Sequence, residues 1–374
     1  MTDLLEATGM AEAPAAVLAA QLDYGGAWER VRKKAGMAGV DGVTTSRFGG
    51  SAESTLKDLE FDLAGGRYQP LPLRMAQIEK KSGGSARLLM VPTVVDRIAQ
   101  TAAAQWLGMK WNTSFDRASF GYRPGMGVRD ALRRLHELRD SGFIWVLDAD
   151  IRSFFDSIDH ELLLEKLARC LGQTSPIRGW VESWIRTSVW DGVALLQVTH
   201  GVPQGSPLSP ILSNFYLHEL DVRLRSSKIQ FIRYADDFLV LARTPFDLAE
   251  SRSVVDGVLK DLRLSLNEEK TRTVTFDKCF RFLGAEMQSD QILLPFEKKK
   301  EAFGPADVSP IMPPGLLRAF RSGDLKAAKS LIWTGIRETA AQHQTQSSPT
   351  SSGKACEALR GGQTPVSMKL LSGR

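Results

Sequence analysis

The stretch Phe231-Ile-Arg-Tyr-Ala-Asp-Asp-Phe-Leu-Val-Leu-Ala242 decides the fold. Two apolar, β-prone runs, 231–234 and 238–242, flank the acidic step Asp236-Asp237, and this pattern predicts a β-hairpin with aspartates at or near its tip. Taken alone, such a pair is most often a solvated acidic turn. Adjacent carboxylates repel one another, however, and a divalent cation such as Mg²⁺, which prefers hard oxygen ligands, would make use of them.

A further acidic position lies upstream, in Phe143-Ile-Trp-Val-Leu-Asp-Ala-Asp150. Residues 143–147 are almost continuously apolar, which predicts a buried central strand. Asp150 comes where this strand ends, and Asp148, two residues earlier, faces the same side. Opposite the acidic hairpin, Asp150 would complete a carboxylate cluster able to hold two metal ions about 3.5–4 Å apart.

Asp150 and Tyr234-Ala235-Asp236-Asp237 resemble the first and second palm motifs of a group II intron-type (retron-type) reverse transcriptase. The resemblance implies an α+β right-hand polymerase, with fingers and a palm whose antiparallel sheet is backed by helices. It implies that Asp150 and Asp236 are the principal ligands of two Mg²⁺ ions, for which Mn²⁺ can substitute. Asp237 would be a supporting carboxylate and metal ligand, and Ile151 would lie at the metal and the nucleotide.

Composition sets wider bounds. The chain has 374 residues and a net charge of +5, from 48 Lys and Arg against 43 Asp and Glu, so it is mildly basic and permits a nucleic-acid partner. Its three widely spaced cysteines suggest neither a disulfide framework nor a zinc site. No apolar run approaches the ~18 residues of a membrane span and no signal peptide begins the chain, so a cytoplasmic location without membrane contact is expected.

A basic loop follows in Ile78-Glu-Lys80-Lys-Ser-Gly-Gly-Ser-Ala-Arg87. It joins two β-prone segments, and Lys80 and Arg87 could clamp a triphosphate, although a solvated basic loop fits the residues equally well. The resemblance places both side chains against the incoming nucleotide. The family usually has Ile-Pro-Lys where this chain has Ile-Glu-Lys, which leaves Lys81 as a rival to Lys80.

A tight loop is predicted at Gly201-Val-Pro-Gln-Gly-Ser-Pro-Leu-Ser-Pro210, with a helix from Ile211 to Arg223 directly after it. By resemblance, Gln204 contacts the incoming nucleotide. Many intron maturases have glycine where Ser206 stands, and the serine form is closer to CRISPR-associated relatives.

Four other side chains receive roles from the resemblance. Phe155, five residues after Asp150, would be the steric gate against the ribose 2′-hydroxyl, unless it is plain core beside its neighbour. Lys270 would protonate the pyrophosphate leaving group, unless it is only a surface lysine. Arg97 and Arg123 would bind nucleic acid by contacting phosphates of the template, although a structural ion pair is as good an explanation for each.

The expected domain order is an N-terminal extension (1–24), fingers (25–140), a palm (141–295), a short helical thumb-like or partner-binding segment (296–339) and a disordered tail (340–374). The thumb would be absent, abbreviated or supplied by a partner. Amphipathic segments, and segments that follow helix-start signals, predict helices at 24–34, 54–65, 128–139, 159–171, 211–223 and 246–264. A further helix is expected after the segment 91–100 and ends at Trp106.

The predicted function is RNA-directed DNA polymerisation, in which dNTPs are added to a DNA or RNA primer on an RNA template. One alternative is an RNA-binding maturase or splicing cofactor with the same fold. Another is a component of a phage-defence assembly, such as a CRISPR adaptation complex, that works with a partner protein.

Overall fold

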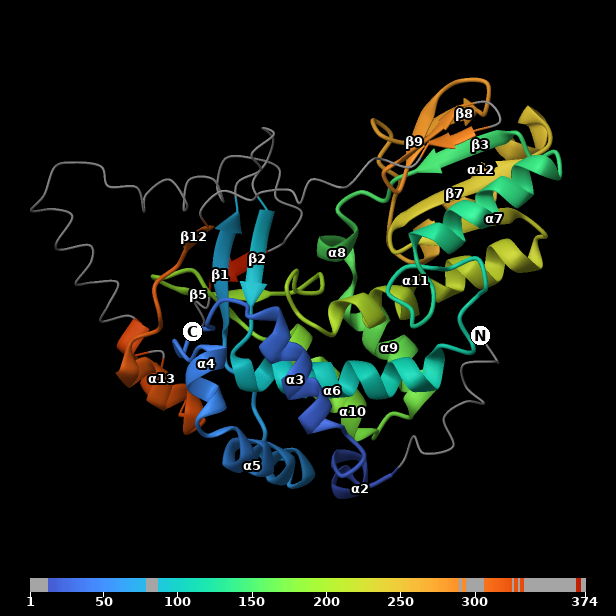
Figure 1. Ribbon diagram of the computed structural model, residues 1–374. Helices are drawn as coiled ribbons and strands as arrows, with labels where there is room; N and C mark the ends of the chain where they lie inside the picture. Colours follow the sequence, from blue (N-terminus) through green and yellow to red (C-terminus); the bar gives the residue numbers. More distant parts are fainter. Residues whose placement is uncertain are drawn as a thin grey trace, which may run out of the picture. The chain divides into compact units, whose positions relative to one another are not determined.

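The computed structural model of the chain describes residues 13–78, 87–288, 291–293, 306–324, 326–328, 330–332 and 368–370. These residues form two compact units that interleave along the sequence (Figure 1). The first unit is built from 103–178 and 207–293, and the second from 14–102, 179–206 and the described residues from 306 onward. Within the described residues, no helix is long and apolar enough to cross a membrane.

The first unit is organised around a four-stranded antiparallel sheet. Its order is β6 (Gln230–Tyr234), β7 (Asp237–Ala242), β3 (Trp145–Ala149), β8 (Arg272–Thr275). The hairpin predicted from the acidic stretch is confirmed as β6 and β7, and Tyr234 pairs with Asp237 across a two-residue loop. The predicted central strand is confirmed as β3, which begins two residues later than its apolar run.

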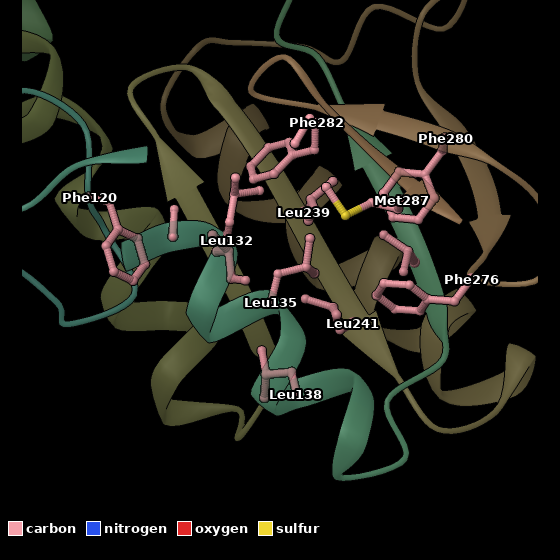
Figure 2. Packing of buried hydrophobic residues seen from close by; sticks show 14 residues of the cluster. Phe120, Leu132, Leu135, Leu138, Leu239, Leu241, Phe276, Phe280, Phe282 and Met287 are labelled. Atoms are coloured by element: carbon pink, nitrogen blue, oxygen red, sulfur yellow. The ribbon is translucent and has the colours of Figure 1, made fainter. Parts of the chain in front are cut away.

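Helices cover both faces of this sheet. Helix α7 (Val128–Asp140) packs against β6 on one face. Helix α11 (Ser209–Ser226) contacts β6, and α12 (Pro245–Asp261) contacts β7 and β3. Alternate residues of β7 point to opposite faces, so Leu239 and Leu241 join the leucines of α7 in one cluster. Figure 2 shows these leucines meeting across the helix–sheet interface. The backed antiparallel sheet predicted for a palm is therefore present.

A smaller sheet shares this core. Strands β9 (Phe280–Phe282), β10 (Ala285–Gln288) and β11 (Gln291–Leu293) pair in the order β11-β10-β9, all antiparallel. Phe280, Phe282 and Met287 belong to the same hydrophobic cluster as α7 (Figure 2). This packing fixes β9 and β10 against the larger sheet.

The helix ends follow local chemistry. Helix α9 (His160–Leu171) begins one residue later than predicted, because Asp159 is its N-cap and accepts a hydrogen bond from the Leu162 backbone N–H at 2.9 Å. The Thr244 side chain caps α12 in the same way. The other helices are α6 (Val94–Trp111), α8 (Phe154–Ser157) and α10 (Pro176–Ile185), of which the short α8 and α10 were not predicted.

The second unit contains a six-stranded sheet. Its order is β12 (Ala306–Val308), β1 (Leu73–Ile78), β4 (Val189–Trp190), β5 (Leu195–Val198), β13 (Met368–Leu370), with β2 (Arg87–Val91) also paired to β1. Its helices are α2 (Ala15–Ala19), α3 (Tyr24–Lys34), α4 (Thr45–Gly49), α5 (Ala52–Ala64) and α13 (Pro314–Arg321). The two β-prone segments around the basic loop are confirmed as the antiparallel pair β1 and β2.

Several predictions concern residues outside the described ranges. Lys80, its rival Lys81 and the side chain of Arg87 belong to this group, as do the first half of the expected N-terminal extension and most of the expected tail. The sequential borders of fingers, palm and thumb-like segment stay predictions.

Candidate active site

Asp150 is held by its backbone at the end of β3. Its N–H donates to Thr271 Oγ1 at 3.3 Å, and its carbonyl accepts from the Asn267 N–H at 2.7 Å. The next residue, Ile151, is buried and forms a β-bridge with Leu266. The segment after α12 therefore fixes the backbone from which the Asp150 carboxylate projects.

The register of the sheet brings the acidic hairpin alongside. Ala149 pairs with Phe238, so the next position along the two strands sets Asp150 opposite Asp237. The hairpin loop consists of Ala235 and Asp236. Three predicted carboxylates thus share one edge of the sheet, although they are 86 residues apart in the chain from Asp150 to Asp236.

The carboxylates are close enough to affect one another's ionisation. Partial burial, together with the negative charges of Asp236, Asp150 and Asp148, raises the pKa of Asp237 to about 6. Burial and the charge of Asp150 also raise the pKa of Asp236. A cation placed among these groups would relieve this repulsion.

Two basic side chains already balance part of this charge. Lys270 Nζ lies 3.3 Å from Asp150 Oδ2, and the lysine side chain is 66% exposed. Arg272 Nε donates to Asp148 Oδ2 at 2.9 Å. Asp148 is therefore committed to an arginine, whereas Asp150 has an exposed lysine that can move aside.

The donor set fits a magnesium ion that is bound together with its substrate. As the described side chains stand, no three Asp, Glu, His or Cys residues converge into a ready-made metal site. Mg²⁺ usually takes one or two protein carboxylates and completes its shell with water and substrate phosphates. Asp150 and Asp236 provide such a pair of carboxylates at one edge, with a cationic ammonium group already beside Asp150.

Phe155 and Phe154 differ in their surroundings. Both belong to the short α8, which follows Ser153, a residue with a φ of 43°. Phe154 is 2% exposed, whereas Phe155 remains partly exposed and contacts Phe154 with ring centroids 5.4 Å apart. The exposure of Phe155 argues against plain core and favours a ring that can meet a ligand.

Gln204, a further nucleotide-binding candidate, lies in the second unit. The carbonyl of Gln204 accepts a hydrogen bond from the Met90 N–H at 2.9 Å, and Ser206 Oγ donates to Gln100 Oε1. Gly205 has a φ of 118° and lies against Met90. The predicted tight loop is therefore fixed to β2, the strand that begins at Arg87.

Both candidate nucleic-acid arginines are buried among backbone carbonyls. Arg97, 8% exposed, donates from Nη2 to Met37 O at 2.9 Å. Arg123, 9% exposed, donates to Asn112 Oδ1 and to the carbonyls of Asn112, Asp116 and Ser119. These hydrogen bonds to carbonyl and amide oxygens favour a structural role for each arginine, where the predicted structural alternative was an ion pair.

Tyr122 was not among the predicted site residues. Burial and the charges of Asp236, Tyr234 and Asp237 raise the pKa of its hydroxyl, which places that hydroxyl near the acidic hairpin. Its backbone φ of 58° is uncommon for a tyrosine, and its ring is half-exposed. The sequence signal that could have identified it is an aromatic residue between Gly121 and Gly125.

An antiparallel sheet that presents aspartates at one edge, from a strand end and from the adjacent hairpin, defines the palm of a right-hand polymerase. The family model described as "Reverse transcriptase (RNA-dependent DNA polymerase)" matches residues 78–287, more than half of the chain. The chain belongs to the reverse transcriptase family. Its enzyme class is that of the RNA-directed DNA polymerases.

Curated relatives agree with this assignment. The chain is 32% identical to protein YkfC of Escherichia coli K12 over 293 residues, which cover 67% of this chain and 76% of YkfC. It is 27% identical to the group II intron-encoded protein LtrA of Lactococcus lactis over 237 residues, which cover 63% of this chain but 38% of LtrA. The likeness to a group II intron-type reverse transcriptase is therefore confirmed.

Two solved structures are similar over about two thirds of the chain. Telomerase from Candida albicans, in complex with a fragment of telomeric RNA, matches with a TM-score of 0.49 and 18% identity, covering 66% of this chain and 51% of that one. A partial Cas6-RT-Cas1–Cas2 complex matches with a TM-score of 0.39 and 29% identity, covering 64% and 40%.

Proposed function

We propose that the chain extends a primer 3′-hydroxyl with dNTPs on an RNA template, using two Mg²⁺ ions held by Asp150 and Asp236. The observation that carries this proposal is the register of β3 and β7, which sets Asp150 opposite the acidic hairpin. When bound, the metal supplies activation of the hydroxyl and neutralisation of phosphate charge.

The side chains of the first unit have separate tasks in this proposal. Asp150 and Asp236 present carboxylate oxygens to the metal, and Asp237 adds negative charge beside them. Lys270, with its ammonium group 3.3 Å from Asp150, holds a proton that the departing pyrophosphate can accept. Phe155 borders the sugar and excludes a 2′-hydroxyl.

Gln204 and the basic residues Lys80 and Arg87 are proposed to bind the nucleotide. The support for Gln204 is its place in a loop whose backbone is fixed to β2 and closed by Gly205. A fixed loop is suited to presenting an amide that hydrogen-bonds a sugar or a base. For Lys80 and Arg87 the support is their spacing around the basic loop in the sequence.

The alternative of a purely RNA-binding cofactor receives less support. Such a protein has no need of three carboxylates at one sheet edge, where burial and then their mutual repulsion raise the pKa of Asp237. RNA template and primer are the partners that a reverse transcriptase requires. A defence-complex protein as an additional partner stays a prediction.

Primer extension with the purified chain tests the proposal. An RNA template annealed to a DNA primer should be extended in the presence of Mg²⁺, extension should stop on addition of EDTA, and Mn²⁺ should restore it. Extension that persists in EDTA would contradict the metal assignment. Tight RNA binding without any extension would favour the cofactor alternative.

A further inference from the structure

Arg233 is a charged residue inside an apolar strand. It lies between Ile232 and Tyr234 in β6, and its side chain is 0% exposed. Burying an unpaired charge is strongly unfavourable, so a buried arginine is retained only with good partners. These partners show what the residue does.

One helix supplies two of them. Arg233 Nε and Nη2 donate to the two carboxylate oxygens of Asp221 at 2.7 and 2.5 Å, and Nη1 donates to Asn214 Oδ1 at 2.8 Å. Asn214 and Asp221 are seven residues apart on α11, about two helical turns, so they project from the same face. Both side chains are completely buried.

The same guanidinium reaches the loop that carries Asp236. Its Nη1 also donates to Ala235 O at 3.0 Å, the carbonyl directly before Asp236. Asn214 Nδ2 donates to Gly121 O at 2.8 Å, and a Cβ added to Gly121 would lie 2.4 Å from Ala235 N. Helix α11, the loop containing Gly121 and the acidic hairpin therefore meet around one side chain.

Ala235 needs such support because its backbone is strained. Its φ is 61°, in the left-handed region that favours glycine. A residue other than glycine keeps this conformation only where its surroundings over-determine it. The hydrogen bond from Arg233 and the close approach of Gly121 restrict the loop on two sides.

We infer that Arg233, together with Asp221 and Asn214, is a positioning residue that holds the Ala235 loop and thereby sets the Asp236 carboxylate for metal binding. This inference rests on the proposed function, in which Asp236 binds the metal. Arg233 is completely buried behind the loop and affects the metal only by fixing the backbone that carries Asp236.

The test uses Arg233→Lys in the full chain. Lysine keeps the positive charge for Asp221, but a single ammonium group cannot replace a planar fork that serves Asp221, Asn214 and Ala235 together. Amide hydrogen exchange at residues 235–237 should become faster by about tenfold. Mn²⁺ binding, followed by electron paramagnetic resonance of the free ion, should weaken by about tenfold.

A second variant and a control separate this effect from a general loss of stability. Asn214→Ala leaves the Arg233–Asp221 ion pair and removes only the hydrogen bonds to Gly121 and to Arg233 Nη1. Amide exchange at 235–237 should therefore become about threefold faster, and Mn²⁺ binding about threefold weaker. Lys166→Met, on α9, breaks a partly buried ion pair, 2.5 Å long, with Glu219 of the same helix α11. It should lower the melting temperature without changing exchange at 235–237 or Mn²⁺ affinity.

In primer extension, Arg233→Lys should raise the Mg²⁺ concentration needed for half-maximal rate and leave the KM for dNTP within about twofold. Unchanged exchange and Mn²⁺ binding in folded Arg233→Lys and Asn214→Ala would overturn the inference even if the wild-type chain extends primers. If Arg233→Lys does not fold, Asn214→Ala decides. A wild-type chain that shows no extension would count against the proposed function instead.

Discussion

At the scale of single residues, the neighbours Phe154 and Phe155 offer a matched pair. Phe155 is partly exposed, whereas Phe154 is buried. An aromatic ring beside the sugar leaves the ribose 2′-hydroxyl desolvated and without a hydrogen-bond partner. Phe155→Val should therefore raise rNTP incorporation relative to dNTP incorporation by about tenfold or more.

Phe154→Val is the control for this prediction. Removing buried ring atoms should lower stability by about 2–4 kcal/mol without changing the choice of sugar. Single-nucleotide incorporation assays with rNTP and dNTP measure the ratio, and thermal melting measures stability. Equal effects of both variants on the ratio would rule out the steric-gate assignment.

His218 makes a second residue-scale prediction, on the pH dependence of stability. Burial, followed by the positive charges of Arg233 and Lys166, lowers the pKa of His218 from 6.5 to about 4, while Asp116 opposes this shift. Between these values the unfolded chain binds the proton more readily than the folded chain, so stability is lost as pH falls from 6.5 towards 4.

The measurement compares wild type with His218→Gln by urea denaturation at pH 7.5 and pH 4.5. The variant should lose less stability than wild type on acidification, by about 2 kcal/mol. The comparison between the two proteins cancels the titration of the other acidic groups. An identical pH dependence in both would show that His218 does not carry this effect.

At the scale of structural elements, the acidic hairpin depends on the loop that contains Gly121. A Cβ at this position would lie 2.4 Å from Ala235 N, which is backbone and cannot rotate away. Gly121→Ala should destabilise the chain by about 1–3 kcal/mol and slow primer extension more than this loss of folded protein explains.

Gly108→Ala provides the comparison for this prediction. Gly108 lies in α6, and a Cβ there would meet nothing within 4 Å. Alanine is the better helix former, so this variant should be neutral or more stable by up to about 1 kcal/mol. Thermal melting and extension rates of both variants check the pair. A neutral Gly121→Ala would contradict the close packing described for the hairpin.

The elements that the sequence predicted well are those with a local signal. The apolar runs of β7 and β3 and the amphipathic segment of α9 each identify their element without help from distant residues. The short strands β4 and β5 were missed because two to four residues carry no period. They exist because neighbouring strands of the six-stranded sheet supply their partners.

The residues of the candidate site likewise include some with a local sequence signal and some without one. Asp150, Asp236 and Asp237 were predictable because acidic residues at strand ends stand out from apolar surroundings. The role inferred for Arg233 was not predictable, because it depends on contacts with Asn214 and Asp221. Both residues lie on α11, and no sequence pattern links them to the hairpin. The buried contacts of Arg97 and Arg123 are likewise invisible in their own sequence neighbourhoods.

At the scale of the whole molecule, function depends on pairing between distant parts of the chain. Strand β3 is separated from β7 by the segment 179–206, which belongs to the other compact unit. Long-range pairing of this kind forms slowly, because loop closure precedes the contacts that reward it. The metal site is therefore a property of the completed fold.

The most direct measurement is extension of an oligo(dT) primer on poly(rA) by wild type, Asp236→Asn and the surface control Asp256→Asn. Asp256 lies on α12 in an exposed ion pair with Arg252, 3.7 Å long, so its loss should change neither folding nor rate. The amide in Asp236→Asn keeps the shape of the side chain but loses the charge that holds Mg²⁺. We expect a folded Asp236→Asn protein with no detectable extension, beside normal extension by Asp256→Asn, whereas near wild-type extension by folded Asp236→Asn would contradict the account.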